Sequence, residues 1–450
     1  MADRKATSGR RTLQLIDGAG IYGSRAATGG SWIFFSGTAV DESGMTRGPD
    51  RLAAGYRNSP VAQVRSQTRW MFERFGEILE ELGSSFEDVV QIEQTIERKV
   101  QQDGYLEVSR SKDFFARRRP GSLMLQAGSY LPPDAVINVN GLALIPSDEI
   151  PGKEIRRTDL IYASPKKDLD VILPADKYPQ FQENLSDEPP YSEVVTAGPY
   201  VFNTALASDY HTGPHPDSKI GSWSSWGSEM RNEATWMVQA LDKKLTVGGT
   251  SFENVVHCTA YLNEIEDLYE LDLVWAKLFP KDPPARTLVP IRGLGQPRIE
   301  GAKHHWEGSP KMEIQFRSLR PGHGAERRVV SIGEGALPTE SDAVGVDELL
   351  WIGGQLAANS EGPRTDGSTG KQLDYVFDRI ASICHAGGTE LSNLLRIRAY
   401  VADQETGYAF FSKLKERIPE APPASSVIIV SQPLHVPECT VSVDAVAFVP

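Results

Sequence analysis

The sequence predicts an α+β protein in which one unit of strands and helices occurs three times. Three segments carry the repeat, and each leads from a glycine into alternating apolar residues: GSSFEDVVQIEQTIE from Gly83, GTSFENVVHCTAYLN from Gly249 and GTELSNLLRIRAYVA from Gly388. A helical pattern precedes each glycine, and a second amphipathic segment follows each alternating run. Because 450 residues exceed what one core holds, several domains are expected.

The elements of each unit follow in a fixed order. The opening strands are WIFFSGTAV, YVFNTALAS and LLWIGGQLA, and a long helix with one apolar face comes next. The glycine ends that helix in the left-handed conformation. A strand, a second helix and two further strands complete the unit. We therefore expect units at 15–147, 188–319 and 328–450, separated at 148–187 by a polar, proline-punctuated linker or extension.

Composition excludes several classes of protein. The formal net charge of −13 argues against a nucleic-acid surface. The sequence has no apolar run long enough to span a bilayer and no secretory leader pattern. Three widely spaced cysteines, Cys258, Cys384 and Cys439, indicate reduced thiols and a cytoplasmic protein. No phosphate-binding or cofactor motif is present, so we expect no cofactor and no metal.

One copy of the repeat carries an arginine that the others lack. Counting 37 or 38 residues from each repeat glycine reaches Gly121, Arg286 and Ser425, so these positions are equivalent. Arg286 lies in the middle copy, in PPARTLVPIRGL at 283–294. A guanidinium at the mouth of an apolar strand is suited to grip a carboxylate through two parallel hydrogen bonds.

The middle copy resembles the RidA (YjgF-type) family of enamine/imine deaminases. The resemblance rests on PPYSEVV at 189–195, GTSFENVV at 249–256, PPARTLV at 283–289 and MEIQFRSL at 312–319. It implies three tandem YjgF-like (chorismate-mutase-like) domains. Because members of that family are homotrimers with sites between subunits, it also implies an intrachain pseudo-trimer with three unequal grooves. Such a chain would be a monomer or a dimer of pseudo-trimers.

The resemblance also implies roles for a charged pair. Arg286 falls on the family position that holds a substrate carboxylate, and Glu313 on the position that orients or activates the attacking water. The equivalents of Glu313 are Asn138 and Ser442. We therefore predict one groove with Arg286 and Glu313 as catalytic residues and two degenerate grooves. A structural ion pair at an internal interface is the alternative.

Further positions in the middle copy are candidates for substrate contact. Tyr191 matches a family tyrosine that lines the groove, and its equivalents are Tyr22 and Glu340. Asn203 stands where the family has a serine, and Asp272 where many members have an asparagine.

Two long loops of the middle copy are rich in histidine and tryptophan. They contain His211 and His215, and His304 and His305, and we expect a lid or specificity wall with the last two contacting substrate. Prolines next to His215 argue against a helical metal site.

The leading functional hypothesis is hydrolysis of a C–N bond in a small carboxylate-bearing imine or enamine. A chorismatase-like hydrolase or lyase acting on a cyclic carboxylate is a second possibility, because such enzymes look built on related folds. A non-catalytic ligand-binding or scaffold pseudo-trimer is the third.

Overall fold

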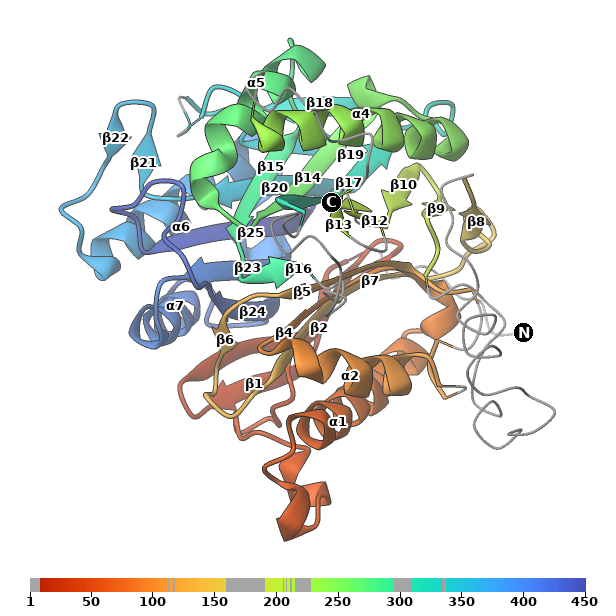
Figure 1. The fold of residues 1–450 in the computed structure, drawn as a ribbon, viewed down its shortest axis with the longest axis vertical. Coiled ribbons are helices and arrows are strands. Elements are labelled where there is room, and N and C mark those ends of the chain that lie inside the picture. Colours follow the sequence, from red (N-terminus) through yellow and green to blue (C-terminus); the bar gives the residue numbers. More distant parts are fainter. Residues whose placement is uncertain are drawn as a thin grey trace.

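Six α-helices surround a set of β-sheets in the described part of the computed structural model. It describes residues 9–111, 113–115, 118–158, 191–204, 206–207, 209–210, 213–214, 228–294, 310–333, 335 and 337–450. Figure 1 shows the helices in three pairs on different sides of the strands: α1 with α2, α4 with α5, and α6 with α7. The α+β class is therefore confirmed.

The first part of the chain, called the N-terminal unit, contains three opening strands, two helices and four further strands. In order they are β1 (Arg11–Gly18), β2 (Ile21–Gly29), β3 (Trp32–Thr38), α1 (Pro60–Glu81), β4 (Val89–Ile96), α2 (Gln102–Ser109), β5 (Gly121–Gln126), β6 (Ser129–Tyr130) and β7 (Ile137–Leu144). Ser59 caps α1 by accepting a hydrogen bond from the backbone of Ala62. Short 3-10 turns precede several elements: η1 (Pro49–Arg51), η2 (Ala54–Tyr56), η3 (Phe86–Asp88) and η4 (Lys99–Gln101).

The middle unit follows a short strand, β8 (Glu154–Arg156), that pairs with its first strand. Its elements are β9 (Val194–Ala197), β10 (Tyr200–Asn203), β11 (Leu206–Ala207), β12 (Asp209–Tyr210), β13 (Gly213–Pro214), α4 (Glu229–Gly248), η7 (Phe252–Asn254), β14 (Val255–Leu262), η8 (Ile265–Asp267), α5 (Leu268–Leu278), β15 (Ala285–Pro290), β16 (Gly293–Leu294) and β17 (Met312–Leu319).

The C-terminal unit completes the chain. It comprises β18 (Arg327–Val330), β19 (Ala343–Val346), β20 (Leu349–Gln355), β21 (Ala358–Asn359), β22 (Gly362–Pro363), α6 (Thr369–Ala386), η9 (Leu391–Asn393), β23 (Leu394–Val401), α7 (Gln404–Arg417), β24 (Ala424–Ile429) and β25 (Val441–Phe448). The glycine that follows the long helix of each unit has positive φ: 73° at Gly83, 78° at Gly249 and 83° at Gly388. Only glycine adopts this conformation without steric cost, so these helices end where the sequence predicts.

Strand pairing is the same in the three units. The strand after the long helix pairs in parallel with the strand after the second helix, as β4–β5, β14–β15 and β23–β24. On its other edge it pairs antiparallel with the last strand, as β4–β7, β14–β17 and β23–β25. The last strand in turn pairs with an opening strand, β3, β10 or β20. The second helix of each unit, α2, α5 or α7, connects the two parallel strands, because parallel neighbours need a long crossover connection.

Each sheet has two buried faces. One packs on the helices of its own unit, which gives three separate apolar cores. The other faces the interior, where all three units contribute to shared apolar clusters. There Trp32 packs edge-on against Tyr200 at 5.3 Å between ring centroids, and Tyr200 lies 6.2 Å from Trp351. The three units therefore share a central core.

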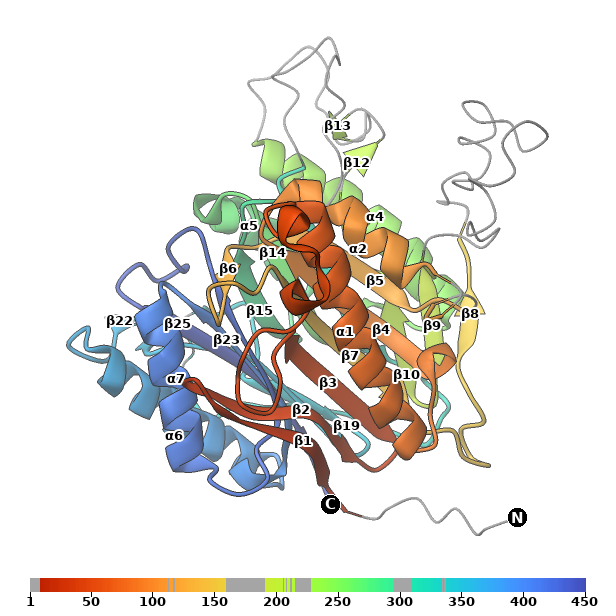
Figure 2. The ribbon, with the colours of Figure 1, turned by 90° about the horizontal axis from the view of Figure 1, so that it is seen from below.

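The units are joined edge to edge. Strand β2 pairs with β24, which merges the N-terminal and C-terminal sheets. Strand β16 of the middle unit pairs with β5 and completes this sheet of 14 described strands. A bridge between Ala285 and Ser341 links the middle and C-terminal units. Figure 2 shows β1 and β2 beside the blue α7. None of the described helices is long and apolar enough to cross a membrane.

Gly353 allows the middle and C-terminal units to approach closely. A Cβ atom at this position would lie 2.8 Å from the backbone oxygen of Arg286 and 2.9 Å from its nitrogen. We expect Gly353→Ala to lower the free energy of unfolding by about 1–3 kcal/mol, because two packed backbones must separate. Urea unfolding measures it, with Gly370→Ala in α6 as control, where the nearest atom is 4.0 Å away. Equal stability of both variants would contradict the close approach.

Candidate active site between the middle and C-terminal units

Arg286 is the second residue of β15, a strand that begins directly after two prolines, and its side chain is completely buried. In the strand register it pairs with Cys258, which belongs to the core beneath α4 and α5. Its guanidinium therefore lies on the helix-facing side of the sheet, with its carbon 5.0 Å from the centre of the Trp275 ring on α5. This placement is a cation–π contact in a desolvated setting.

Asp272 on α5 holds the end of the guanidinium. Nη1 of Arg286 donates to Oδ1 of Asp272 at 2.6 Å, and Nη2 donates to Oδ2 at 3.3 Å. The hydroxyl of Thr339 accepts from Nη2 of Arg286 at 3.0 Å and donates to Oδ2 of Asp272 at 2.8 Å. Asp272, predicted as a candidate for substrate contact, thus forms a two-pronged ion pair with Arg286, the strongest arrangement for these groups.

Glu340 of the C-terminal unit completes the cluster. Nε of Arg286 donates to its Oε2 at 3.3 Å, and 13% of the Glu340 side chain is exposed. Burial raises the pKa of Glu340 to about 7, with Asp272 and Asp342 adding to the rise and Arg286 opposing it. A carboxyl group with a pKa near neutrality can both give and take a proton at physiological pH.

These groups line a polar cleft between the two units. Its empty volume, including the part open to solvent, is about 410 Å³. On its far side Arg379 of α6 donates to Gln355 at 2.6 Å and to Asp342 at 2.5 Å. The lining residues are Arg286, Ser331, Gly333, Gly335, Glu340, Ser341, Asp342, Gly354, Gln355, Leu356, Ala358 and Arg379. The cleft thus combines a proton-exchanging acid, ion pairs and access from solvent.

The structure does not bring Glu313 to this cleft. Strand β14 lies between β15 and β17, and Cys258 is opposite both Arg286 and Phe316. Glu313 is three residues from Phe316, so alternation directs it to the opposite face of the sheet, opposite Tyr261. The predicted Arg286–Glu313 pair within one groove is therefore wrong in geometry. The acid beside Arg286 comes from the next unit.

Tyr191 and Asn203 lie away from this cleft, at the contact between the N-terminal and middle units. Ser192 donates from its backbone to Pro120 at 3.0 Å, which places neighbouring Tyr191 against the N-terminal unit. Asn203 ends β10, is buried, and accepts through its carbonyl a hydrogen bond from Gln91 at 3.3 Å. Arg286 and Asp272 thus lie at the contact between the middle and C-terminal units, whereas Tyr191 and Asn203 lie at the contact between the N-terminal and middle units. His211, His215, His304 and His305 lie outside the described residues.

Sequence reasoning noted Glu340 as the equivalent of Tyr191 but did not place it in the site. An acid in the position of that tyrosine was the available signal. The acid at this position could be recognised as a site residue only with one further fact. The segment of the C-terminal unit that carries Glu340 packs against β15, the strand of the middle unit that carries Arg286.

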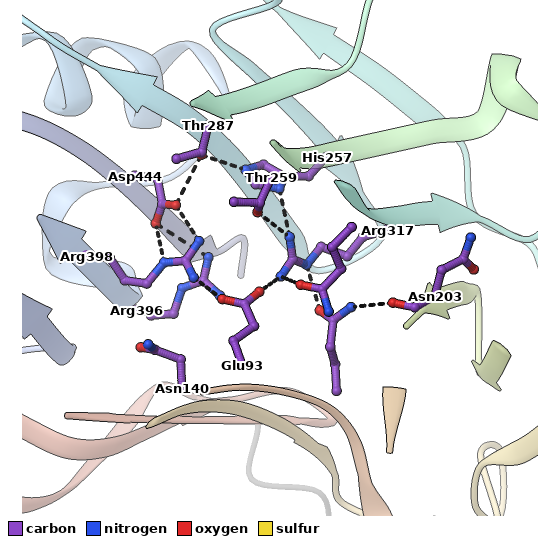
Figure 3. A network of polar contacts seen from close by, with 12 residues as sticks. Glu93, Asn140, Asn203, His257, Thr259, Thr287, Arg317, Arg396, Arg398 and Asp444 are labelled. Atoms are coloured by element: carbon purple, nitrogen blue, oxygen red, sulfur yellow. Dashed lines mark hydrogen bonds and ion pairs between the residues drawn. The ribbon is translucent and has the colours of Figure 1, made fainter. Parts of the chain in front are cut away.

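A second cluster of charges lies in the centre of the molecule (Figure 3). Glu93 on β4 forms ion pairs with Arg317 of β17 and with Arg398 of β23, so one carboxylate joins all three units. Arg398 also donates to both oxygens of Asp444, at 2.9 and 2.5 Å. The Glu93 side chain is 5% exposed and those of both arginines are 1% exposed.

Neutral partners extend this central network. His257 contacts Arg317 through Nδ1 at 3.1 Å and the Thr287 hydroxyl through Nε2 at 3.2 Å, and Thr287 donates to Asp444 at 3.1 Å. Burial, reinforced by the neighbouring arginines, holds the pKa of His257 well below its ordinary value. Because these side chains are enclosed, we assign the central network to assembly of the units rather than to chemistry.

A family model described as Endoribonuclease L-PSP matches residues 182–300 and 337–449, which is more than half of the chain. No curated protein matches the chain.

Similar solved structures include a chorismatase, at 11% identity and a TM-score of 0.47, covering 80% of this chain and 93% of that chain. Yeast Mmf1 has 21% identity and a TM-score of 0.26, covering 28% of this chain and 100% of that one. RidA from an Antarctic Psychrobacter has 22% identity and a TM-score of 0.25, covering 27% and 98%.

Proposed function

Because the chain belongs to the YjgF/RidA (Endoribonuclease L-PSP) family, we propose that it is a hydrolase of small-molecule C–N bonds, of the imine or enamine type. We further propose that its three units are tandem YjgF-like domains forming an intrachain pseudo-trimer. The matching strand pairings support this arrangement, and the family model covers the second and third units. The reaction would occur in the cleft that Arg286 and Glu340 line.

The observation that carries the proposal is the Glu340 carboxyl group, whose pKa is raised to about 7 at the edge of an open cleft. In its neutral form Glu340 would protonate the imine nitrogen. The resulting carboxylate would accept a proton from the water that adds to the carbon. That proton is then returned to the nitrogen. As ammonia leaves and the carbonyl forms, the Glu340 carboxylate would take up the hydroxyl proton and recover its neutral form, so that imine and water become carbonyl and ammonia. Arg286 would hold Glu340 in place and stabilise its anionic form.

The predicted carboxylate on the substrate is not part of this proposal. It required free donors on Arg286, and the side chain of Arg286 is fully buried with Nε, Nη1 and Nη2 all donating within the protein. The description of the family model names an endoribonuclease, but the net charge of −13 does not favour a polyanionic substrate.

Glu340→Gln tests the assignment against the original one. We expect it to slow ammonia release from imines by about 100-fold or more, because general acid–base catalysis is removed. Glu313→Gln, on the opposite face of the sheet, should retain the rate. In the parent protein kcat/KM should fall as pH rises through about 7, because the neutral carboxyl is the reactive form. Loss of activity in Glu313→Gln but not in Glu340→Gln would restore Glu313 as the catalytic residue.

A second candidate, ligand binding without catalysis, is favoured because both paired donor edges of Arg286 are occupied within the protein. It predicts that ligands bind equally well to Glu340→Ala and that no imine is hydrolysed. Turnover of chorismate without ammonia would instead support the chorismatase-like alternative.

A further inference from the structure

The cleft shows which class of ligand it can hold. Arg286 presents two flat pairs of donors on which a ligand carboxylate could dock. Asp272 takes the end-on pair, Nη1 and Nη2, at 2.6 and 3.3 Å. Glu340 and Thr339 take the side-on pair, Nε and Nη2, at 3.3 and 3.0 Å. Both docking edges of the guanidinium are therefore filled from within the protein.

The other guanidinium of the cleft, Arg379, is engaged on its side-on edge. Arg379 donates through Nε to Gln355 at 2.6 Å and through Nη2 to Asp342 at 2.5 Å. The second carboxylate oxygen of Asp342 accepts the backbone N–H of Ile332 at 2.8 Å. Docking of a ligand acid on this edge of Arg379 would have to break the buried pair, at a cost of several kcal/mol.

The charges do not favour an anion either. Among the described residues of the cleft and its wall, two arginines face three acids, Asp272, Glu340 and Asp342. The sum is −1 with Glu340 ionised and 0 with it protonated. His435 adds no positive charge, because burial and then Arg286 lower its pKa to about 4. A ligand cation would gain from this balance and a ligand anion would lose.

We infer that Asp272 occupies the place of a ligand carboxylate on Arg286, and that the cleft binds an amine- or iminium-bearing molecule without a carboxylate. This inference rests on the proposed function for the reaction but concerns binding alone. The nitrogen of the ligand lies against Glu340, where the reaction would need it. Asp272 is then a specificity-determining residue. Its carboxylate occupies the Nη1 and Nη2 edge of Arg286, and its negative charge repels ligand acids.

Affinities of size-matched probes test this at pH 8, where Glu340 is ionised. We expect the full-length protein to bind n-propylammonium at least tenfold more tightly than propionate, as measured by ligand-observed NMR titration. The Asp272→Asn change removes one of the two carboxylate oxygens that accept from Arg286, and with it one negative charge. Propionate affinity should therefore rise at least tenfold, and propylammonium affinity should fall. Asp242→Asn, on an exposed position of α4, removes the same charge outside the cleft and should change neither.

A second variant keeps the test valid if Asp272→Asn is unstable. Glu340→Gln should weaken propylammonium at least tenfold and raise propionate affinity far less than Asp272→Asn does, because both donor edges of Arg286 stay occupied. Propionate binding to the parent as tightly as propylammonium, or unchanged by Asp272→Asn in a folded protein, would overturn the inference. Turnover that survives in Glu340→Gln would overturn the proposed function and leave this binding preference standing, so the two failures are distinguishable.

Discussion

Glu93→Gln should lower the free energy of unfolding by about 3–5 kcal/mol, the usual cost of breaking a buried ion pair. Glu93 is the carboxylate between Arg317 and Arg398, and Arg396 lies in the same cluster, 3.5 Å from Asp444. Without Glu93, three buried arginines retain one carboxylate. The amide is close in shape to the acid, so the loss reports charge rather than packing.

Urea unfolding followed by tryptophan fluorescence measures this difference. Glu107→Gln is the matched control, because its pair with Arg65 is exposed, with 62% and 44% of the two side chains accessible. An exposed pair contributes less than about 1 kcal/mol. If the two variants were equally stable, the central network would not hold the units together electrostatically.

Acid should destabilise the protein in two steps that trace to the same network. The arginines hold the pKa of Glu93 at about 2, against the opposing effect of burial. A carboxyl whose folded pKa is below its unfolded value stabilises the fold above the unfolded pKa, and this stability is lost as pH falls through the folded value. The loss from Glu93 therefore runs from about pH 4.5 to 2 and amounts to about 3 kcal/mol.

His257 produces the earlier step. Its folded pKa is held well below 6.5, so the unfolded chain binds the proton first and stability falls as pH drops below about 6.5. Glu340 acts in the opposite direction between about pH 4.5 and 7, since its pKa is raised. Comparing variants with the parent separates these contributions.

The stability difference between parent and His257→Gln should shrink below pH 6.5, and that between parent and Glu93→Gln should shrink below pH 4.5. Unfolding curves recorded from pH 7 to pH 3.5 provide the measurement. Differences that stay constant over this range would show that neither group has a shifted pKa.

Local patterns predicted the elements of the fold. The glycines at positions 83, 249 and 388 have the left-handed conformation that their place after an apolar helical face predicts. Strand β23 follows the alternation of its apolar residues, and Arg286 lies at the start of a strand where the two prolines place it. Such features depend on residues close in the chain.

The partners of Arg286 could not be predicted in the same way. Copy-by-copy counting assumed that an arginine and an acid in one unit share a groove, whereas Arg286 meets Glu340, 54 residues later, in the next unit. Which segment of the C-terminal unit lies beside β15 depends on how the sheets of the units pack together, and no local sequence pattern records this. The central network was missed for the same reason, because Glu93 and Arg398 lie 305 residues apart.

The pairing of β2 with β24 bears on biosynthesis. Ser24 pairs with Ala424, so the N-terminal β-sheet leaves the ribosome long before its partner strand is translated. Until then the backbone hydrogen-bonding groups of β2 near Ser24 lack their β24 partner, and they can pair with strands of other incompletely folded chains. Closure of this sheet therefore cannot precede synthesis of the C-terminal strands, and misassembly before that point would lower the yield of native protein.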